Sequence, residues 1–244
     1  MDDDDAEPSD PELVCAATPG GDGAAAGVVQ LVSSGALDRD ALAERIVGMP
    51  GVGGHGGHGE LGDDGLDGAT AAASEVFDVT AYPDYVFDAS MVEPDARIEI
   101  TATGENVISL VDAGDPPVIA VAELVVRSGA TLAISCDVRI VAAHVLVEQG
   151  GTLALQSRNE GACTFAIGSV ERGPGLRGGI ATIASASFEL HGTIDLSGSD
   201  GAPASPGGAG GGLTVLAETI VLGDTAVIDV SGGAGGDGVD EDEC

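Results

Sequence analysis

The sequence predicts an all-β fold: a single-stranded parallel β-helix (β-solenoid) of about five or six rungs, preceded by a cap region that contains one short helix. Two observations lead to this prediction. Short stretches of alternating apolar residues recur between residues 96 and 232, each broken by a turn. Aliphatic residues are plentiful, whereas aromatic residues make up only 2% of the chain. Stacked repeats suit this composition because each rung buries a few small side chains against those of its neighbours.

Each predicted rung has an anchor, an apolar residue just after its turn. The anchors are Leu132, Leu153, Ile194 and Ile228, with a fainter copy at Ile108. One turn of a parallel β-helix takes about 20 to 25 residues, which fits the first two intervals. We interpret the interval from Leu153 to Ile194 as two turns and the last interval as one turn with a loop from Gly198 to Gly212. The weaker of the two turns would carry Cys163, Phe165, Ile167 and Val170.

The chain divides into four predicted parts. Residues 1–27 are acidic and Gly/Ala-rich, and we expect them to be flexible. Residues 28–95 form the cap region, with a helix from Leu37 to Gly48 that begins at the N-cap Asp38 and covers one end of the stack. Residues 96–232 form the parallel β-helix, and residues 233–244 form a Gly-rich acidic tail. We expect the last rung, around Val227 to Val230, to have open strand edges that another copy can pair with.

The formal net charge of −33, with arginine as the only strongly basic residue, excludes nucleic acid as a partner. No apolar run reaches the roughly 18 residues of a membrane span, so we expect no membrane insertion. A salt-rich environment and GC-rich coding both explain the lack of lysine, and composition leaves the two open. No signal peptide is visible after Met1. We expect an extracellular or cell-surface location and leave the cytoplasm as the alternative.

The four cysteines have no spacing typical of zinc ligands. Cys136 and Cys163 are about one rung apart, and both a disulfide and two buried free thiols are compatible with this spacing. Cys15 and Cys244 lie near opposite ends of the chain, where oxidation would cross-link subunits.

Two stretches contain candidate metal ligands. Residues 232–240 match one copy of the Ca²⁺-binding nonapeptide repeat, which makes Asp237, Asp240 and Asp242 candidate Ca²⁺ ligands. A single copy is more typical of a flexible acidic tail, because such sites share each ion between consecutive turns. His55, His58 and Glu60 are candidate ligands of a transition metal, with an ordinary Gly-rich loop as the alternative.

The runs Thr193–Gly198 and Val227–Gly233, separated by a Gly-rich loop, resemble the Gly-rich β-solenoid segments of bacterial and archaeal surface and adhesin-like proteins. The resemblance covers roughly residues 98 to 236 and implies a rigid spacer, an adhesive surface or an assembly unit. We therefore expect a non-catalytic structural protein, an acidic building block that self-assembles into a surface layer, filament or fibre.

Two other functions are compatible with the sequence, and both have a polysaccharide as partner. The first is a β-helix lyase or glycoside hydrolase, which needs several carboxylates in a cleft near residues 156–179 and 198–212. The sequence contains no recognisable catalytic residues for it. The second is a carbohydrate- or surface-binding module that uses a row of outward threonines, for which the candidates are Thr131, Thr152, Thr193 and Thr214.

Overall fold

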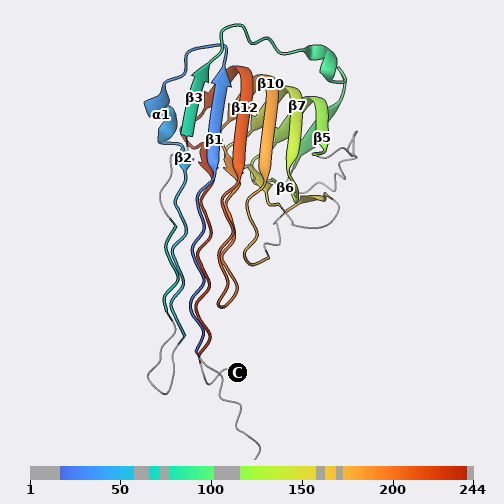
Figure 1. Ribbon diagram of the computed structural model, residues 1–244. Helices are drawn as coiled ribbons and strands as arrows, with labels where there is room; N and C mark the ends of the chain where they lie inside the picture. The colour runs from blue at the N-terminus through green and yellow to red at the C-terminus, as the bar shows by residue number, and fades with distance from the viewer. Residues whose placement is uncertain are drawn as a thin grey trace, which may run out of the picture.

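The computed structural model describes residues 17–57, 66–71, 77–101, 116–157, 163–168 and 173–240. Over these residues the fold is all-β, with two sheets built mainly from parallel strand pairs (Figure 1). The larger sheet has seven strands in the order β3-β1-β12-β10-β7-β5-β4, and the smaller has six in the order β2-β13-β11-β8-β6-β9. Among the described residues, no helix has the length and apolar character needed to cross a membrane.

The larger sheet contains β1 (Val28–Ser33), β3 (Phe77–Ala81), β4 (Arg97–Ile100), β5 (Val118–Val126), β7 (Val138–Val147), β10 (Ile180–Leu190) and β12 (Gly212–Leu222). The smaller sheet contains β2 (Ile46–Val47), β6 (Thr131–Ile134), β8 (Thr152–Leu155), β9 (Phe165–Ile167), β11 (Thr193–Asp195) and β13 (Val227–Asp229). The two helices are α1 (Arg39–Ala43) and the 3-10 helix η1 (Ala89–Met91).

From β5 to β13, with β9 as the exception, consecutive strands alternate between the two sheets, and β1 and β2 do the same. Two such consecutive strands, one in each sheet, form a strand pair, and each strand pair stacks on the next in parallel register. Four of the predicted anchors lie in register across the smaller sheet, in the order Leu132, Leu153, Ile194 and Ile228. Their side chains are fully buried between the two sheets. The fainter anchor, Ile108, lies outside the described residues. A second inward column crosses the larger sheet through Ile119, Ile140, Ile183, Val215 and Leu31. Burying one such side chain contributes about 1.5–3 kcal/mol to stability, so these columns hold the sheets together.

The prediction of two turns between Leu153 and Ile194 is wrong. β8 pairs directly with β11, so this interval contains a single turn and an excursion. Within the excursion, β9 runs antiparallel to β6 at the edge of the smaller sheet. The alternation of Phe165 and Ile167 correctly indicates a strand, but alternation carries no information about the partner strand or its direction.

The stack does not end at β12 and β13. β1 pairs with β12, and β2 pairs with β13, so that Ile228 lies in register with Ile46. The expected open edge at Val227–Val230 is therefore covered by an N-terminal strand pair, β1 with β2. The expectation that residues 28–95 precede the first rung is also wrong for β1 and β2, because they extend the stack at its C-terminal end. Parallel stacking requires matching strand spacing and does not require chain order.

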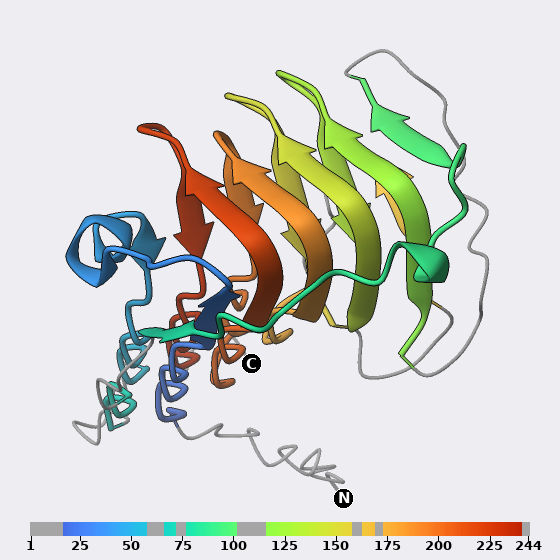
Figure 2. The same ribbon diagram turned by 90° about the horizontal axis from the view of Figure 1, so that it is seen from above.

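Helix α1 lies at this same end of the stack (Figures 1 and 2). Asp38 is its N-cap, and its side chain accepts hydrogen bonds from the amides of Asp40 and Ala41 at 3.1 and 3.3 Å. Leu37 and Leu42 pack against the core. The prediction of a helix from Leu37 to Gly48 is wrong in its second half, because α1 ends at Ala43 and β2 follows at Ile46–Val47. A helix this short is stable only when docked, and here it is docked beside the terminal strand pair.

A long connection, which we call the strap (residues 82–96), crosses the outer face of the larger sheet from β3 at one edge to β4 at the other (Figure 2). Phe87 and Val92 of the strap form a small apolar cluster with Val141. The amide of Phe87 donates to the carboxylate of Glu218 at 2.7 Å. These contacts fix the strap on the outer face of the larger sheet, at the place where its long strands bend.

Candidate functional site: the glycine bundle

Beyond the edge of the sheets the Gly-rich parts of the chain lie side by side as extended segments (Figure 1). We call them together the glycine bundle: residues 18–27, 48–57, 66–71, 173–179, 197–204, 205–211 and 231–240. None of these residues belongs to a helix or strand. Hydrogen bonds nevertheless connect every segment to its neighbours.

The hydrogen bonds of the bundle recur every three residues. Gly51, Gly54 and Gly57 donate in turn to the carbonyl oxygens of Ala24, Gly21 and Thr18 at 2.7–2.9 Å. Three residues per turn is the repeat of the polyproline II helix. This helix forms no internal hydrogen bonds, so its amides and carbonyls point outward to several neighbours. The segments are drawn as wound traces when the molecule is seen from above (Figure 2).

The bundle has two layers, and each layer continues one sheet. Segments 66–71, 18–27, 205–211 and 173–179 lie side by side in that order, parallel to each other, and run toward β3, β1, β12 and β10. Segments 48–57, 231–240 and 197–204 follow β2, β13 and β11 and run in the opposite direction. The lateral order of the segments matches the strand order of each sheet, so the bundle extends the stack with a different backbone conformation.

Glycine is required in the bundle because the backbones touch. A Cβ on Gly51, Gly54 or Gly57 would overlap the carbonyl oxygen of Gly233, Gly236 or Val239. Of the bundle glycines, only Gly175 has a positive φ. The usual reason for glycine, access to left-handed backbone angles, therefore does not apply to the others. Side chains appear at the third positions that face outward, such as Met49, Val52 and His55.

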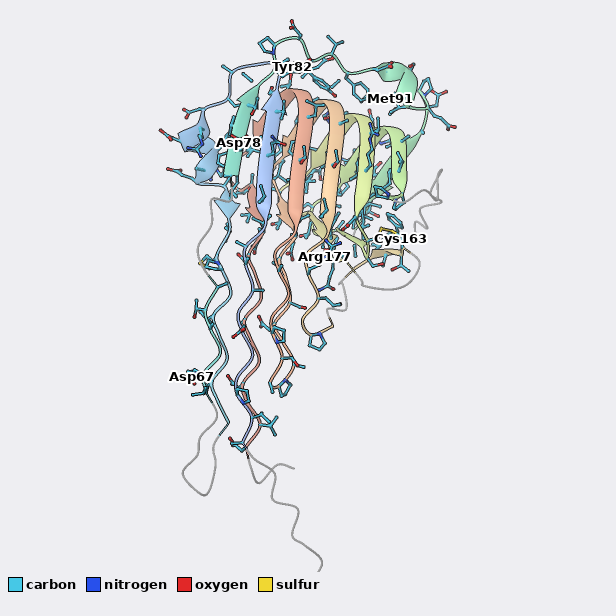
Figure 3. All side chains as sticks on the ribbon, viewed as in Figure 1. Asp67, Asp78, Tyr82, Met91, Cys163 and Arg177 are labelled. Atoms are coloured by element: carbon cyan, nitrogen blue, oxygen red, sulfur yellow. A yellow bond between two sulfur atoms is a disulfide. The ribbon has the colours of Figure 1, made fainter. Side chains whose placement is uncertain are left out.

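Four aspartates stabilise the bundle by accepting hydrogen bonds from backbone amides of a neighbouring segment. The pairs are Asp22 with Ala69 at 2.7 Å, Asp67 with Gly56 at 2.9 Å, Asp200 with Ala234 at 2.8 Å and Asp237 with His55 at 2.9 Å. Asp67 lies on the outermost segment of its layer (Figure 3). Thr70 on the same segment accepts from the amide of Gly53 at 3.4 Å. Three of these amides, those of Ala69, Gly56 and His55, lie on the edge segments 66–71 and 48–57, where they would otherwise be free to pair with another chain.

The candidate metal ligands fall in this bundle or outside the described residues. Asp237 binds the amide of His55, and Nδ1 of His55 lies 3.7 Å from Asp67. Asp240 is described, whereas His58, Glu60 and Asp242 lie outside the described residues. Within the described residues, no group of three or more His, Cys, Asp and Glu side chains is arranged to hold a metal ion. For Asp237 and His55 the structure thus gives a role in hydrogen bonding between segments.

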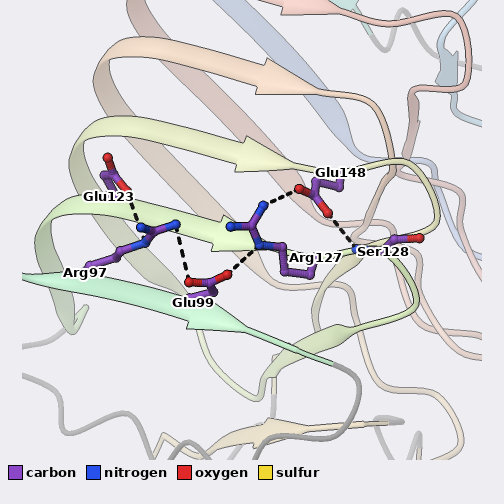
Figure 4. Close-up of polar contacts among 6 residues, drawn as sticks. All are labelled: Arg97, Glu99, Glu123, Arg127, Ser128 and Glu148. Carbon is purple, nitrogen blue, oxygen red and sulfur yellow. Dashed lines mark hydrogen bonds and ion pairs between the residues drawn. The ribbon is translucent and has the colours of Figure 1, made fainter.

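A second polar feature lies on or directly after strands β4, β5 and β7, at the end of the stack opposite to β1 and α1. We call it the charge ladder, and it consists of Arg97, Glu99, Glu123, Arg127 and Glu148 (Figure 4). Arg97 contacts Glu99 at 3.3 Å and Glu123 at 3.1 Å. Arg127 contacts Glu99 at 2.6 Å and Glu148 at 2.5 Å. Parallel register brings these residues together, because Arg97 pairs with Glu123 across β4 and β5.

The charge ladder changes the pKa values of its members. Hydrogen bonds to Glu99 and Glu148 raise the pKa of Arg127. Hydrogen bonds from Arg127 and from the amide of Ser128 lower the pKa of Glu148. A general acid in a glycosidase requires a raised carboxyl pKa, whereas this carboxylate is held in its charged form. The ladder is therefore suited to cross-linking strands.

A disulfide joins Cys136 and Cys163, whose Cα atoms lie 5.2 Å apart (Figure 3). It ties the excursion that contains β9 to the corner between β6 and β7. Ser135 and Thr164 next to it are joined by a hydrogen bond between their hydroxyl groups at 2.6 Å. The excursion is thereby fixed against the edge of the smaller sheet.

One pocket lies between the segments 173–179 and 197–204, where the enzyme alternative requires a cleft. It is lined by Gly173, Pro174, Gly198, Ser199 and Asp200. Ser199 donates to the carbonyl oxygen of Gly173 at 2.6 Å, and Asp200 accepts from Ala234. The lining thus provides one carboxylate, already hydrogen-bonded, whereas glycoside hydrolysis uses a pair.

Sequence reasoning missed the bundle, although a signal for it is present. The pattern Asp-x-Ser-Gly occurs at Asp195 and at Asp229, where strands β11 and β13 pass into the bundle. Asp195 accepts from the amide of Ser197 at 3.1 Å, and Asp229 accepts from Ser231 at 2.9 Å. The glycines that follow at three-residue spacing would have indicated the polyproline II repeat.

Comparison with known proteins adds no relative. No protein-family model matches the chain, and no curated protein or solved structure matches it either.

Proposed function

We propose that this protein is a non-catalytic structural module: a β-solenoid with a rigid glycine-based stalk that serves as a building block of a surface layer, filament or fibre. The strand pairs are the turns of the solenoid, since anchors from successive pairs share one inward column. The glycine bundle is the stalk. Its continuation of both sheets in the same lateral order is the observation that supports this function most directly.

The bundle is built for stiffness. Its interior consists of backbone hydrogen bonds, most of them donated by glycine amides, and the close backbone contacts leave no space for side chains with catalytic groups. Glycine loses more conformational entropy on ordering than any other residue. The backbone hydrogen bonds of the bundle have to offset this entropic cost. An ordered form that is maintained at such a cost is suited to serve as a rigid projection from the stacked body.

The disulfide supports the proposed extracellular or cell-surface location, because disulfides persist in oxidising compartments. The acidic surface supports assembly that depends on ions. With a net charge of −33, copies repel each other at low ionic strength, and salt or Ca²⁺ screens that repulsion. We propose the protein itself as its main partner.

Electron microscopy and light scattering of the purified full chain test this function. We expect particles with a stalk that associate into larger assemblies as salt or millimolar Ca²⁺ replaces EDTA. A monodisperse monomer under all of these conditions would contradict the assembly role.

A carbohydrate- or surface-binding module is the second candidate, favoured by one observation. Thr131, Thr152 and Thr193 lie in register on the smaller sheet as a column of outward hydroxyl groups. Thr214 lies on the larger sheet beside Thr182. Binding of neutral polysaccharides by wild-type protein, lost in Thr152→Val, would favour this second function. An absence of binding favours the structural one.

A further inference from the structure

β3 and β4 correspond to the two halves of one long strand. The long strand β7 runs from Val138 to Ala142, bends, and continues from His144 to Val147. Through the register of the larger sheet, Phe77–Ala81 aligns with the first half, and Arg97–Ile100 aligns with the second. The strap is thus inserted at the position of the bend, and it holds the two halves at opposite edges of the sheet (Figure 2).

The N-terminal block, residues 17–57 with β3, lies after the last strand pair of the chain. It is held there by the pairing of β1 with β12 and of β2 with β13. An ion pair between Arg45 and Asp224 at 3.3 Å and the hydrogen bonds of segment 18–27 add to this contact. None of these contacts depends on the path of the strap, so the same block from another copy can make all of them.

We propose that the surface formed by β12, β13 and segments 205–211 and 231–240 binds the N-terminal block of a second copy of this chain. In this open arrangement the strap no longer spans the stack, and β3 rejoins β4 of its own chain as one bent strand. The strands then stack in chain order, and each copy docks on the next without closing, which produces a filament.

The open arrangement adds contacts that the closed one lacks. β3 becomes the neighbour of the first half of β5, so that Val79 lies in register with Ile119. Val79 is half-buried, pairs with Leu31, and lies at the end of the inward column that Ile119 begins at the other end. Joining the two ends continues this column through both copies and buries the exposed part of Val79, whereas Ile119 is already buried.

The closed arrangement dominates in dilute solution, because the strap keeps the block at an effective concentration on the order of millimolar. Exchange between copies therefore requires a high local concentration, as in a growing assembly. This inference rests on the proposed structural function and specifies how the copies connect.

Inter-chain cross-linking tests the contact directly. Gln30 and Thr214 are neighbours in the register of β1 and β12, and both are partly exposed. We would prepare Gln30→Cys in one chain and Thr214→Cys in another, both with Cys15→Ser and Cys244→Ser. After co-refolding at about millimolar concentration and oxidation, we expect a covalent heterodimer. Gln30→Cys mixed with Thr182→Cys is the matched control, since Thr182 is one strand further away, and it should give at least tenfold less dimer.

Shortening the strap provides a second test. The strap spans six strand spacings, about 29 Å. Deleting residues 84–93 leaves five strap residues, which reach about 20 Å. This full chain with the deletion is expected to form folded oligomers even at micromolar concentration. A control in which a Gly/Ser linker replaces the same ten residues should remain monomeric.

Three results would overturn the open arrangement: a folded monomer of the shortened chain, a shortened chain that stays unfolded while its control folds, or equal cross-linking by both cysteine pairs. If the wild-type protein forms filaments but the Gln30→Cys and Thr214→Cys chains give no cross-link, the open arrangement is also overturned, and the proposed structural function remains intact. A wild-type protein that never assembles would contradict both.

Discussion

The backbone of Gly54 lies against the backbone of Gly236 with no space for a side chain between them. The amide of Gly54 also donates to the carbonyl oxygen of Gly21 at 2.8 Å. Three segments from distant parts of the sequence therefore meet at one glycine. This contact explains why glycine recurs at three-residue intervals in the parts of the chain that form the bundle.

A methyl group at this position should separate the segments. We expect Gly54→Ala to lower the free energy of unfolding by at least about 2 kcal/mol, because the neighbouring atoms are backbone and have no other rotamer to adopt. Gly212→Ala is the control, since a Cβ there would lie 3.7 Å from the side chain of Ile180, an ordinary contact. Urea titration of both variants measures the difference. Equal stability of the two variants would show that the bundle is not close-packed.

The aspartates that accept hydrogen bonds from bundle amides should contribute through their acceptor oxygen. Asp237→Ala removes the acceptor for the amide of His55, whereas Asp237→Asn keeps an oxygen in that position. We expect a loss of about 1 kcal/mol for alanine and less for asparagine, measured by thermal unfolding. If Asp237 acted instead as a Ca²⁺ ligand, both variants would lose a Ca²⁺-dependent rise in melting temperature.

The inward column of anchors should be the most sensitive part of the body. Leu153 is fully buried between Leu132 and Ile194. Leu153→Ala leaves a cavity and should cost about 2–5 kcal/mol. Val221→Ala on the outer face, where the side chain is 40% exposed, should change stability by less than about 1 kcal/mol. A small effect at Leu153 would contradict the stacked core.

Reduction should weaken the excursion. Cys136 and Cys163 are 27 residues apart in sequence, and closing a loop of that length stabilises the fold by about 3.5 kcal/mol in the chain-entropy treatment. The double variant Cys136→Ser with Cys163→Ser should lose roughly this amount. Limited proteolysis should then cut first in the excursion, between β8 and β10. Cleavage first in a bundle segment outside the excursion would contradict the expected role of the disulfide.

Acid should weaken the charge ladder. The pKa of Glu148 is lowered in the folded protein, so its contribution is present at neutral pH and is lost as the pH falls through the acidic range where carboxyl groups take up protons. Glu148→Gln should be less stable than the wild type at pH 7. The difference should shrink as the pH falls below the ordinary glutamate pKa of about 4.3. A difference that grows with acidity would contradict the lowered pKa.

The stacked columns could be predicted from the sequence because alternation and turn spacing directly set the inward positions. Leu132, Leu153, Ile194 and Ile228 are in register as their repeats indicate. The position of β1 and β2 could not be predicted, because a short alternating strand such as Val28–Ser33 fits any open rung. Which rung it joins depends on contacts far away in sequence, such as Arg45 with Asp224.

The bundle could not be predicted from apolar patterning because its order comes from the backbone. Residues such as Gly51, Gly54 and Gly57 have no side chains, and their clustering is also typical of flexible loops. Only the three-residue period, and the need for several neighbouring segments to bond with, distinguish an ordered glycine bundle from flexible loops. Those partners lie in segments as distant as 18–27 and 231–240.

Native-state hydrogen exchange of the glycine amides tests the central claim most directly. If the Gly-rich segments form a rigid continuation of the two sheets, the amides of Gly21, Gly54 and Gly233, which donate to neighbouring segments, should exchange at least 100-fold more slowly than in an unfolded chain. Exchange of these amides at the unfolded rate, while the amides of the sheets remain protected, would contradict the account.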